Sequence, residues 1–339
     1  MRELEVQSQG TVIEAPPTES AWIEPASPAP PPEIGMPVSV PAAPAPRRPE
    51  IVPAAPIVLV DPRSWTLDAA RSLRAAGARV VVLSGCPFEP ALHTRGVQGH
   101  RLPPLGIRPE RWAARLLELA ARLEPRAVVY ACSLPAVEFL RAHRRQVEPH
   151  FTLANIHGLE PHPAVAGPDA ALRQSLLRGD AALEVQIARD RHGEIVGLCV
   201  LAWAPGAPPD VLVTGVDGSE VAARSRDLLE ARRYVGYARL VWAPDRFGHL
   251  VLHAASSVPG STIELARADG VDFSTLAYRI AAGATCPPQR ARGHLVRRLP
   301  TVDPEGCSSD APVVALPQRF SRRDPLPWLA GLLRGLLRP

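Results

Sequence analysis

The stretch LVLHAASSVPGSTIELARADGVDF, residues 250–273, has the pattern of a strand with polar side chains, then a glycine turn, then a helix. Polar groups that leave a strand at such a turn could bind a metal ion or a substrate. The imidazole of His253 could ligate a soft metal, but a single histidine at a strand end is typical of a packed or solvated residue. The stretch therefore predicts the geometry of a site without a full set of ligands.

A second candidate for metal binding is HGLEPHP, which holds His157, Glu160 and His162. The two histidines are five residues apart in a proline-rich segment, and the segment offers no further ligand with the spacing of a zinc site. Coincidence is the better explanation of this cluster.

Nucleophiles and phosphate loops are poorly supported. No serine stands in a G-x-S-x-G setting, and the first strand–helix turn reads VDPRSWT instead of GxGxxG. Cys132 follows an apolar strand, where a cysteine is usually a buried core residue. Arg63, near the start of a helix, could bind an anion, but an arginine at such a position more often faces solvent. Asp190 and Glu194 flank a turn and are expected only to be solvated. The sequence therefore predicts no catalytic, cofactor-binding or metal-ligating residue.

Composition excludes several classes of enzyme. All 38 basic residues are arginine, so no lysine is present to hold a phosphate or form a Schiff base. Walker A loops, lysine-dependent ligases and pyridoxal enzymes are disfavoured together. The net charge of +4 is spread thinly without interleaved aromatics, which argues against a nucleic-acid track. Five cysteines without CxxC spacing indicate reduced thiols and a cytoplasmic location.

Residues 1–56 differ from the rest of the chain. Of the 40 prolines, 14 fall between Pro16 and Pro56. Such a segment cannot bury enough apolar surface to offset its ordering entropy, which predicts a disordered or polyproline tail that could engage a protein partner. No apolar run approaches the roughly 20 residues of a membrane span, and the N-terminus lacks the apolar core of a signal peptide.

Residues 57–150 predict a parallel, Rossmann-like sheet. Apolar strands over residues 57–60, 80–83 and 127–131 alternate with amphipathic helices, and Gly77 is expected to end the first helix. The second helix is expected over residues 109–123 and the third over residues 134–147. This alternation is the pattern of a doubly wound α/β domain.

The remaining chain predicts a linker, a mixed lobe and a final helix. Residues 151–182 are rich in helix and strand breakers and form the expected linker. Residues 183–318 predict an antiparallel hairpin around residues 190–193, a helix capped by Ser219, two strands (GYARLVWA and LVLHAAS) and a helix over residues 272–282. Residues 319–339 predict a short amphipathic helix that docks on its own domain through a stripe formed by Trp328, Leu329, Leu332, Leu333 and Leu336.

In this order of elements the chain resembles the ATP-grasp superfamily of carboxylate–amine ligases. IVLVDPRSWTLDAARSLRAAGARVVVLSG resembles the first part of a pre-ATP-grasp domain, and RDRHGEIVG, ARRYVGYARLVWAPDRFGHLVLHAASSVPGS and ELARADGVDFSTLAYRIAAG resemble the C-terminal lobe. The resemblance covers most of residues 57–339. It implies an α/β protein with a Rossmann-like sheet followed by a mixed α+β lobe.

Two departures from the family put its activity in doubt. The lid that clamps the nucleotide lies between the two halves in the family, and here about thirty breaker-rich residues without lysine take its place. By position, the family's two metal-binding carboxylates, asparagine and arginine fall on Val241, His253, Ala255 and Ser257. Valine and alanine offer no oxygen to Mg²⁺, so only the turn at residues 259–261 and the following helix are retained.

The sequence thus favours a pseudo-enzyme: an ATP-grasp-like scaffold without ATP or Mg²⁺ that binds a protein partner. One alternative is an ATP-dependent carboxylate–amine ligase with unusual ligands such as Asp245, Glu264 or Asp269. A second alternative is a small-molecule binding module whose pocket lies at the carboxyl ends of the strands that end at Val60, Leu83 and Ala131.

Overall fold

The computed structural model describes residues 55–63, 65–156, 159, 182–203, 211–214, 218–245, 247–260, 262–293, 295–298, 313–316, 324, 326, 327 and 330. All of them belong to one unit, Glu50–Pro339. The expected tail and most of the expected linker lie outside the described residues, as do His157, Glu160 and His162.

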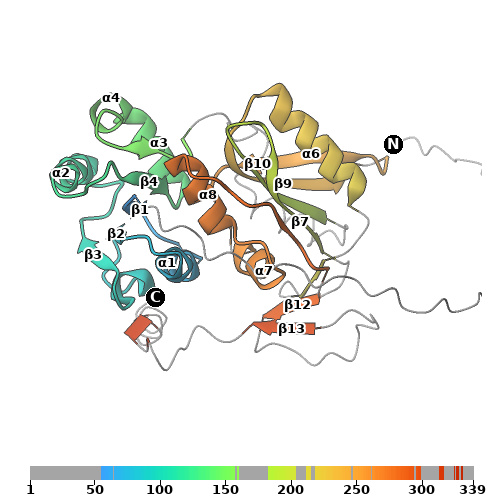
Figure 1. Ribbon diagram of the computed structural model, residues 1–339, viewed down its shortest axis with the longest axis horizontal. Helices are drawn as coiled ribbons and strands as arrows, with labels where there is room; N and C mark the ends of the chain where they lie inside the picture. Colours follow the sequence, from blue (N-terminus) through green and yellow to red (C-terminus); the bar gives the residue numbers. More distant parts are fainter. Residues whose placement is uncertain are drawn as a thin grey trace, which may run out of the picture. The chain divides into compact units, whose positions relative to one another are not determined.

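The first sheet has five parallel strands in the order β3-β2-β1-β4-β5 (Figure 1). Its central strands are apolar on both faces because helices cover them, as in a doubly wound sheet. The strands are β1 (Ile57–Val60), β2 (Val80–Ser84), β3 (Gln98–Arg101), β4 (Val128–Ala131) and β5 (Thr152–Leu153).

The helices of this half lie close to the expected positions. They are α1 (Thr66–Ala75), α2 (Pro109–Ala120), α3 (Leu134–Ala142) and α4 (Arg144–Val147), with a short 3-10 helix η1 (Pro90–His93) between β2 and β3. Gly77 follows α1 with φ +87°, a conformation that glycine adopts without strain. The third predicted helix is broken at His143 into α3 and α4. The ring Nδ1 of His143 lies 3.0 Å from the Phe139 carbonyl oxygen.

The second sheet is mixed, with the order β10-β9-β6-β7-β8-β12-β13, and β11 pairs with β7. Its predicted hairpin is confirmed, because β6 and β7 pair antiparallel and the Asp190 carboxylate accepts hydrogen bonds from the N–H groups of His192 and Glu194. The strands are β6 (Ala182–Arg189), β7 (Ile195–Trp203), β8 (Val211–Thr214), β9 (Gly236–Pro244), β10 (Leu250–Ser256), β11 (Gln289–Arg290), β12 (Leu295–Arg298) and β13 (Val313–Leu316).

Helices cover this sheet on both faces. α6 (Ser219–Ala231) packs on one face, and α7 (Ile263–Ala268) and α8 (Phe273–Ala282) pack on the other, where α8 also contacts β4 and α1 of the first half (Figure 1). The predicted cap at Ser219 is wrong, because Ser219 is the first helical residue and Gly218 is the cap. A Cβ at position 218 would overlap the Val200 side chain, so glycine allows this close approach.

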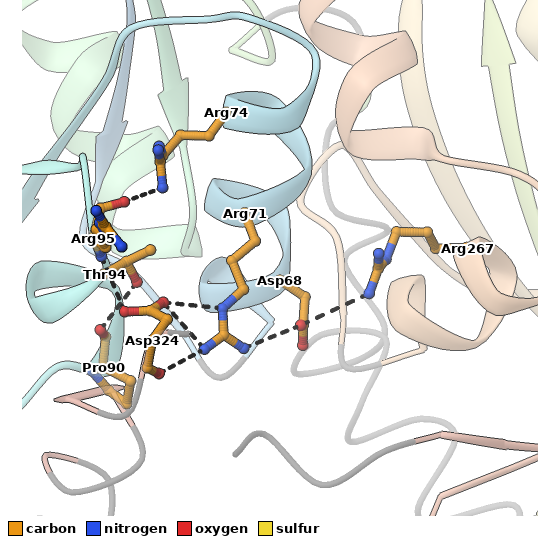
Figure 2. Close-up of polar contacts among 8 residues, drawn as sticks. All are labelled: Asp68, Arg71, Arg74, Pro90, Thr94, Arg95, Arg267 and Asp324. Carbon is orange, nitrogen blue, oxygen red and sulfur yellow. Dashed lines mark hydrogen bonds and ion pairs between the residues drawn. The ribbon is translucent and has the colours of Figure 1, made fainter. Parts of the chain in front are cut away.

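The start of the C-terminal segment contacts α1 (Figure 2). The Asp324 carboxylate forms an ion pair with Arg71 at 3.2 Å and accepts a hydrogen bond from the Arg95 N–H at 3.1 Å. Ala330 is buried. The predicted stripe residues Trp328, Leu329, Leu332, Leu333 and Leu336 lie outside the described part, so the docking of the stripe stays a prediction. Among the described helices, none has the length and apolar character needed to cross a bilayer.

Candidate functional site

A buried ion pair lies on the face of the second sheet that α7 and α8 cover. Glu184 on β6 and Arg239 on β9 are 0% and 1% exposed, and Arg239 Nη2 lies 2.8 Å from Glu184 Oε2. Both strands are central in the sheet, and each residue alternates with apolar neighbours that point to the α6 face. The only way to keep such charges inside a protein is to pair them and satisfy their hydrogen bonds.

The second oxygen of Glu184 is occupied as well. Gln186 Nε2 donates to Glu184 Oε1 at 2.8 Å, and the Thr262 hydroxyl donates to the same oxygen at 2.5 Å. Gln186 Nε2 also donates to the Thr262 hydroxyl oxygen at 3.0 Å. The carboxylate of Glu184 is thus held by a guanidinium, an amide and a hydroxyl.

Gly260, in the turn that follows β10, lies against this group. A Cβ on Gly260 would overlap the guanidinium of Arg239, so the backbone of the turn lies directly against the arginine. Thr262, the N-cap residue of α7, donates the hydroxyl hydrogen bond to Glu184. The turn that the sequence singled out therefore lies at a buried charged network.

The register of the strands corrects the expected metal positions. Val241 lies opposite Glu184 on β6 and opposite Ala254 on β10, so these three side chains share one face. A β-bulge at His253 shifts the rest of β10, and Ala255 therefore lies opposite Leu240, in the apolar cluster on the α6 face. The positions that match the family's ligands therefore do not all share one face, because the bulge places Ala255 on the opposite face from Val241.

The side chains that do share this face with Val241 are apolar or already engaged. Val241 and Ala254 are buried in the main core, and the Ser256 hydroxyl donates to the Val258 carbonyl at 3.3 Å. Ser257 has its own buried partner, because its hydroxyl donates to the Asn155 carbonyl at 2.8 Å. Within the described residues, no group of three His, Cys, Asp or Glu side chains could hold a metal ion.

The carboxylates of the alternative ligase hypothesis lie in different places. Asp245 lies in the β9–β10 turn, where it accepts from the N–H groups of Phe247 and His249. Glu264 and Asp269 are buried on or next to α7. Burial raises the pKa of Cys199, and the carboxylates of Asp269 and Glu184 raise it further, so both acids lie near this thiol.

The carboxyl edge of the first sheet holds a second polar network. Asn155, which follows β5, accepts from the Ala131 N–H at 2.9 Å and donates to the Ala131 carbonyl at 2.8 Å. Its amide also donates to the Ser257 carbonyl at 3.3 Å, and the Tyr130 hydroxyl donates to the same oxygen at 3.3 Å. These bonds connect the end of the parallel sheet to the chain that leaves β10.

Two residues singled out in the sequence also lie at this edge. Arg63 pairs with Asp61 at 2.9 Å, and the Ser133 hydroxyl donates to the same carboxylate. Burial is the main cause that raises the pKa of Cys132, so its thiol stays protonated at neutral pH and matches the expected core cysteine.

The residues missed by sequence reasoning are Glu184, Arg239 and Asn155. The sequence does contain a signal for Glu184. Glu184 and Gln186 alternate with Val185 and Ile187 in β6, and most other residues of this strand are apolar. Two polar residues on one face of a buried strand require partners on that face. The partner Arg239 is 55 positions away, so it could be identified only once the strand order was known.

Comparison with solved structures shows which fold this is. N5-carboxyaminoimidazole synthetase from Staphylococcus aureus, solved with ADP, matches with a TM-score of 0.50 and 10% identity, covering 70% of this chain and 80% of that chain. Biotin carboxylase from Campylobacter jejuni matches with a TM-score of 0.48 and 9% identity over 69% of this chain and 72% of that chain. No protein-family profile and no curated protein sequence matches. The chain therefore has the fold of the ATP-grasp superfamily, a Rossmann-like parallel sheet followed by a mixed α+β lobe.

Proposed function

We propose that this protein is a non-catalytic member of the ATP-grasp fold that acts by binding a protein partner, without ATP or Mg²⁺ as cofactors. One observation carries the proposal: the carboxylate on the site face, Glu184, is neutralised by an arginine of the same chain, Arg239. A cation that is covalently part of the protein takes the role that a bound metal ion would have beside this carboxylate.

The energetics of the pair support this proposal. Mg²⁺ requires several oxygen ligands in near-octahedral geometry, and both oxygens of Glu184 already accept hydrogen bonds. A metal ion could use Glu184 only if Arg239 moved out of its buried position. That movement would separate a desolvated ion pair, which costs several kcal/mol in a protein interior.

The neighbouring positions offer no replacement ligands. Val241 on β9 lies opposite Glu184, and Ala254 on β10 lies opposite Val241, and both are buried in the apolar core. A nucleotide triphosphate placed against this face would keep its negative charge in a low-dielectric environment without a metal ion to balance it. The face is therefore suited to packing against α7 and α8 and not to phosphoryl transfer.

A partner-binding role gives residues 1–56 a function within the same proposal. Their 14 prolines between Pro16 and Pro56 favour polyproline II segments, which aromatic grooves of other proteins bind at low entropic cost. In this proposal the folded lobes serve as the scaffold that carries this segment.

Isothermal titration calorimetry of the full-length protein with ATP, in the presence and absence of Mg²⁺, tests the proposal. We expect no saturable heat for either titration at micromolar protein concentrations. Micromolar binding that requires Mg²⁺ would contradict the proposal and would favour an ATP-dependent ligase with unusual ligands. In that case the release of ADP on addition of a carboxylate and an amine is the next observation to seek.

A further inference from the structure

A cavity of about 380 Å³ lies beyond the C-terminal end of β6, whereas Glu184 lies near the N-terminal end of this strand. Four parts of the chain form it: the end of β5, the β6–β7 turn, the loop between α6 and β9, and the last turn of α8. Its lining residues are Thr152, Leu153, Ala154, Arg191, Arg232, Arg233, Tyr234, Val235, Ile280 and Ala281. The volume falls at the lower end of the range of about 300–1,000 Å³ that is typical of small-molecule sites.

Three guanidinium groups line this cavity, and its described lining holds no carboxylate. Arg191 is oriented by a hydrogen bond that its Nη2 donates to the Ala281 carbonyl at 2.8 Å. Within the described part of the chain, the side chains of Arg232 and Arg233 form no ion pair or hydrogen bond. Arg144, by contrast, is an exposed arginine that pairs with an acid, Glu148, at 2.8 Å.

The backbone that carries Arg232 and Arg233 is fixed in place. Arg233 has φ +49°, a left-handed conformation that is uncommon for a residue with a side chain. The next residue, Tyr234, is buried; its hydroxyl donates to the Tyr237 carbonyl at 2.6 Å, and Arg189 donates to the Tyr234 carbonyl at 2.9 Å. The loop therefore presents two adjacent arginines toward the cavity without needing to be ordered by a ligand.

The end of α6 accounts for only part of this positive charge. Arginines after a helix C-terminus interact favourably with the helix dipole, which is equivalent to about half a negative charge. Three guanidinium groups exceed that charge several-fold, and Arg191 comes from a different element. Arginine forks bind carboxylate and phosphate oxygens in bidentate geometry, and the Thr152 side chain offers a further hydroxyl.

We propose that this arginine pocket binds a small oxyanion that carries two or more negative charges. Val235, which is 38% exposed, is the apolar lining residue available to contact the non-ionic portion of such a ligand. The inference is independent of the proposed loss of ATP and Mg²⁺ binding, because the pocket lies at the other end of β6 from the Glu184–Arg239 pair. A phosphate compound and a polycarboxylate present the same chemistry to these arginines, so both are needed as probes.

The experiment titrates the full-length protein with inorganic pyrophosphate and, separately, with citrate at constant ionic strength, and follows binding by calorimetry. We expect saturable binding of at least one probe and none of acetate. Arg232→Gln and Arg233→Asn are expected to weaken it by about tenfold or more each, since each removes a charged fork. Asparagine is chosen at position 233 because it tolerates the left-handed backbone.

Arg226→Gln is the matched control, because Arg226 lies exposed on α6, the helix just before Arg232, and is outside the pocket. This variant should bind the probe as the unmodified protein does, and all variants should keep the same thermal midpoint in the absence of the probe. Failure of both pyrophosphate and citrate to bind saturably would overturn the proposal. An equal loss of affinity in Arg226→Gln would also overturn it, since that result indicates attraction by the overall charge.

Discussion

Replacement of Arg239 by methionine should lower the free energy of unfolding by about 3–5 kcal/mol, because it leaves the buried carboxylate of Glu184 without its counter-ion. Methionine has a similar length and keeps most of the packing around Gly260, so the effect comes mainly from the lost charge. Folded proteins are stable by only about 5–15 kcal/mol, so this loss is a large fraction of the total. Urea denaturation followed by tryptophan fluorescence at pH 7 measures it.

Two further variants make this prediction decisive. The double variant Glu184→Met/Arg239→Met should recover most of the loss, because replacing a whole buried ion pair by apolar groups is often neutral or stabilising. It also provides a result if Arg239→Met alone does not fold. Arg144→Met breaks an exposed pair with Glu148 and should leave the denaturation midpoint almost unchanged. A loss below about 1 kcal/mol for Arg239→Met would show that the pair is not desolvated as described.

Asn155→Ala should be the second most damaging change, with a loss of about 2–4 kcal/mol. The substitution removes two donors and one acceptor from a buried region and leaves the Ala131 N–H and carbonyl and the Ser257 carbonyl without this partner. Each buried polar group left unsatisfied costs about 1–3 kcal/mol, partly offset where Tyr130 continues to donate to Ser257. Chemical denaturation with the same fluorescence signal gives the value.

Ser257→Ala is the comparison for Asn155→Ala, because it removes one hydrogen bond, from the Ser257 hydroxyl to the Asn155 carbonyl. It should cost about 1 kcal/mol. If the two variants have equal effects, the amide of Asn155 does not connect the first sheet to the chain after β10 in the way that the hydrogen bonds indicate.

The regular elements could be predicted from the sequence because their side chains follow simple periods. β1 and β2 are continuous apolar runs, as a sheet covered on both faces requires, and α1 ends where Gly77 allows a left-handed turn. The alternation on both sides of residues 190–193 predicts the β6–β7 hairpin, while Asp190, expected only to be solvated, accepts hydrogen bonds that close the turn. In each case the information lies within a few consecutive residues.

Short strands at the edges of the sheets could not be predicted in this way. β3 reads QGHR and has no buried side chain, and β5 has two residues, so neither carries a hydrophobic period. Their strand conformation comes from pairing with β2 and β4, which the local sequence does not encode. β12 was likewise not among the predicted strands, and it pairs with β8 and β13.

The candidate site depends on pairings between distant residues. The sequence singled out the turn that contains Gly260, and the glycine there allows close approach to Arg239. It did not indicate the shift at His253, since a β-bulge has no fixed composition and yet reverses the faces of the residues beyond it. The partners of Glu184 become visible only when β6, β9 and the turn are placed side by side.

A crystal structure of the full-length protein grown with Mn²⁺ and a non-hydrolysable ATP analogue tests the central claim most directly, because anomalous scattering locates manganese without ambiguity. The account predicts no anomalous peak on the face formed by β6, β9 and β10, and a guanidinium of Arg239 in contact with Glu184. A manganese ion bound to the oxygens of Glu184, with Arg239 displaced from the core, would contradict it.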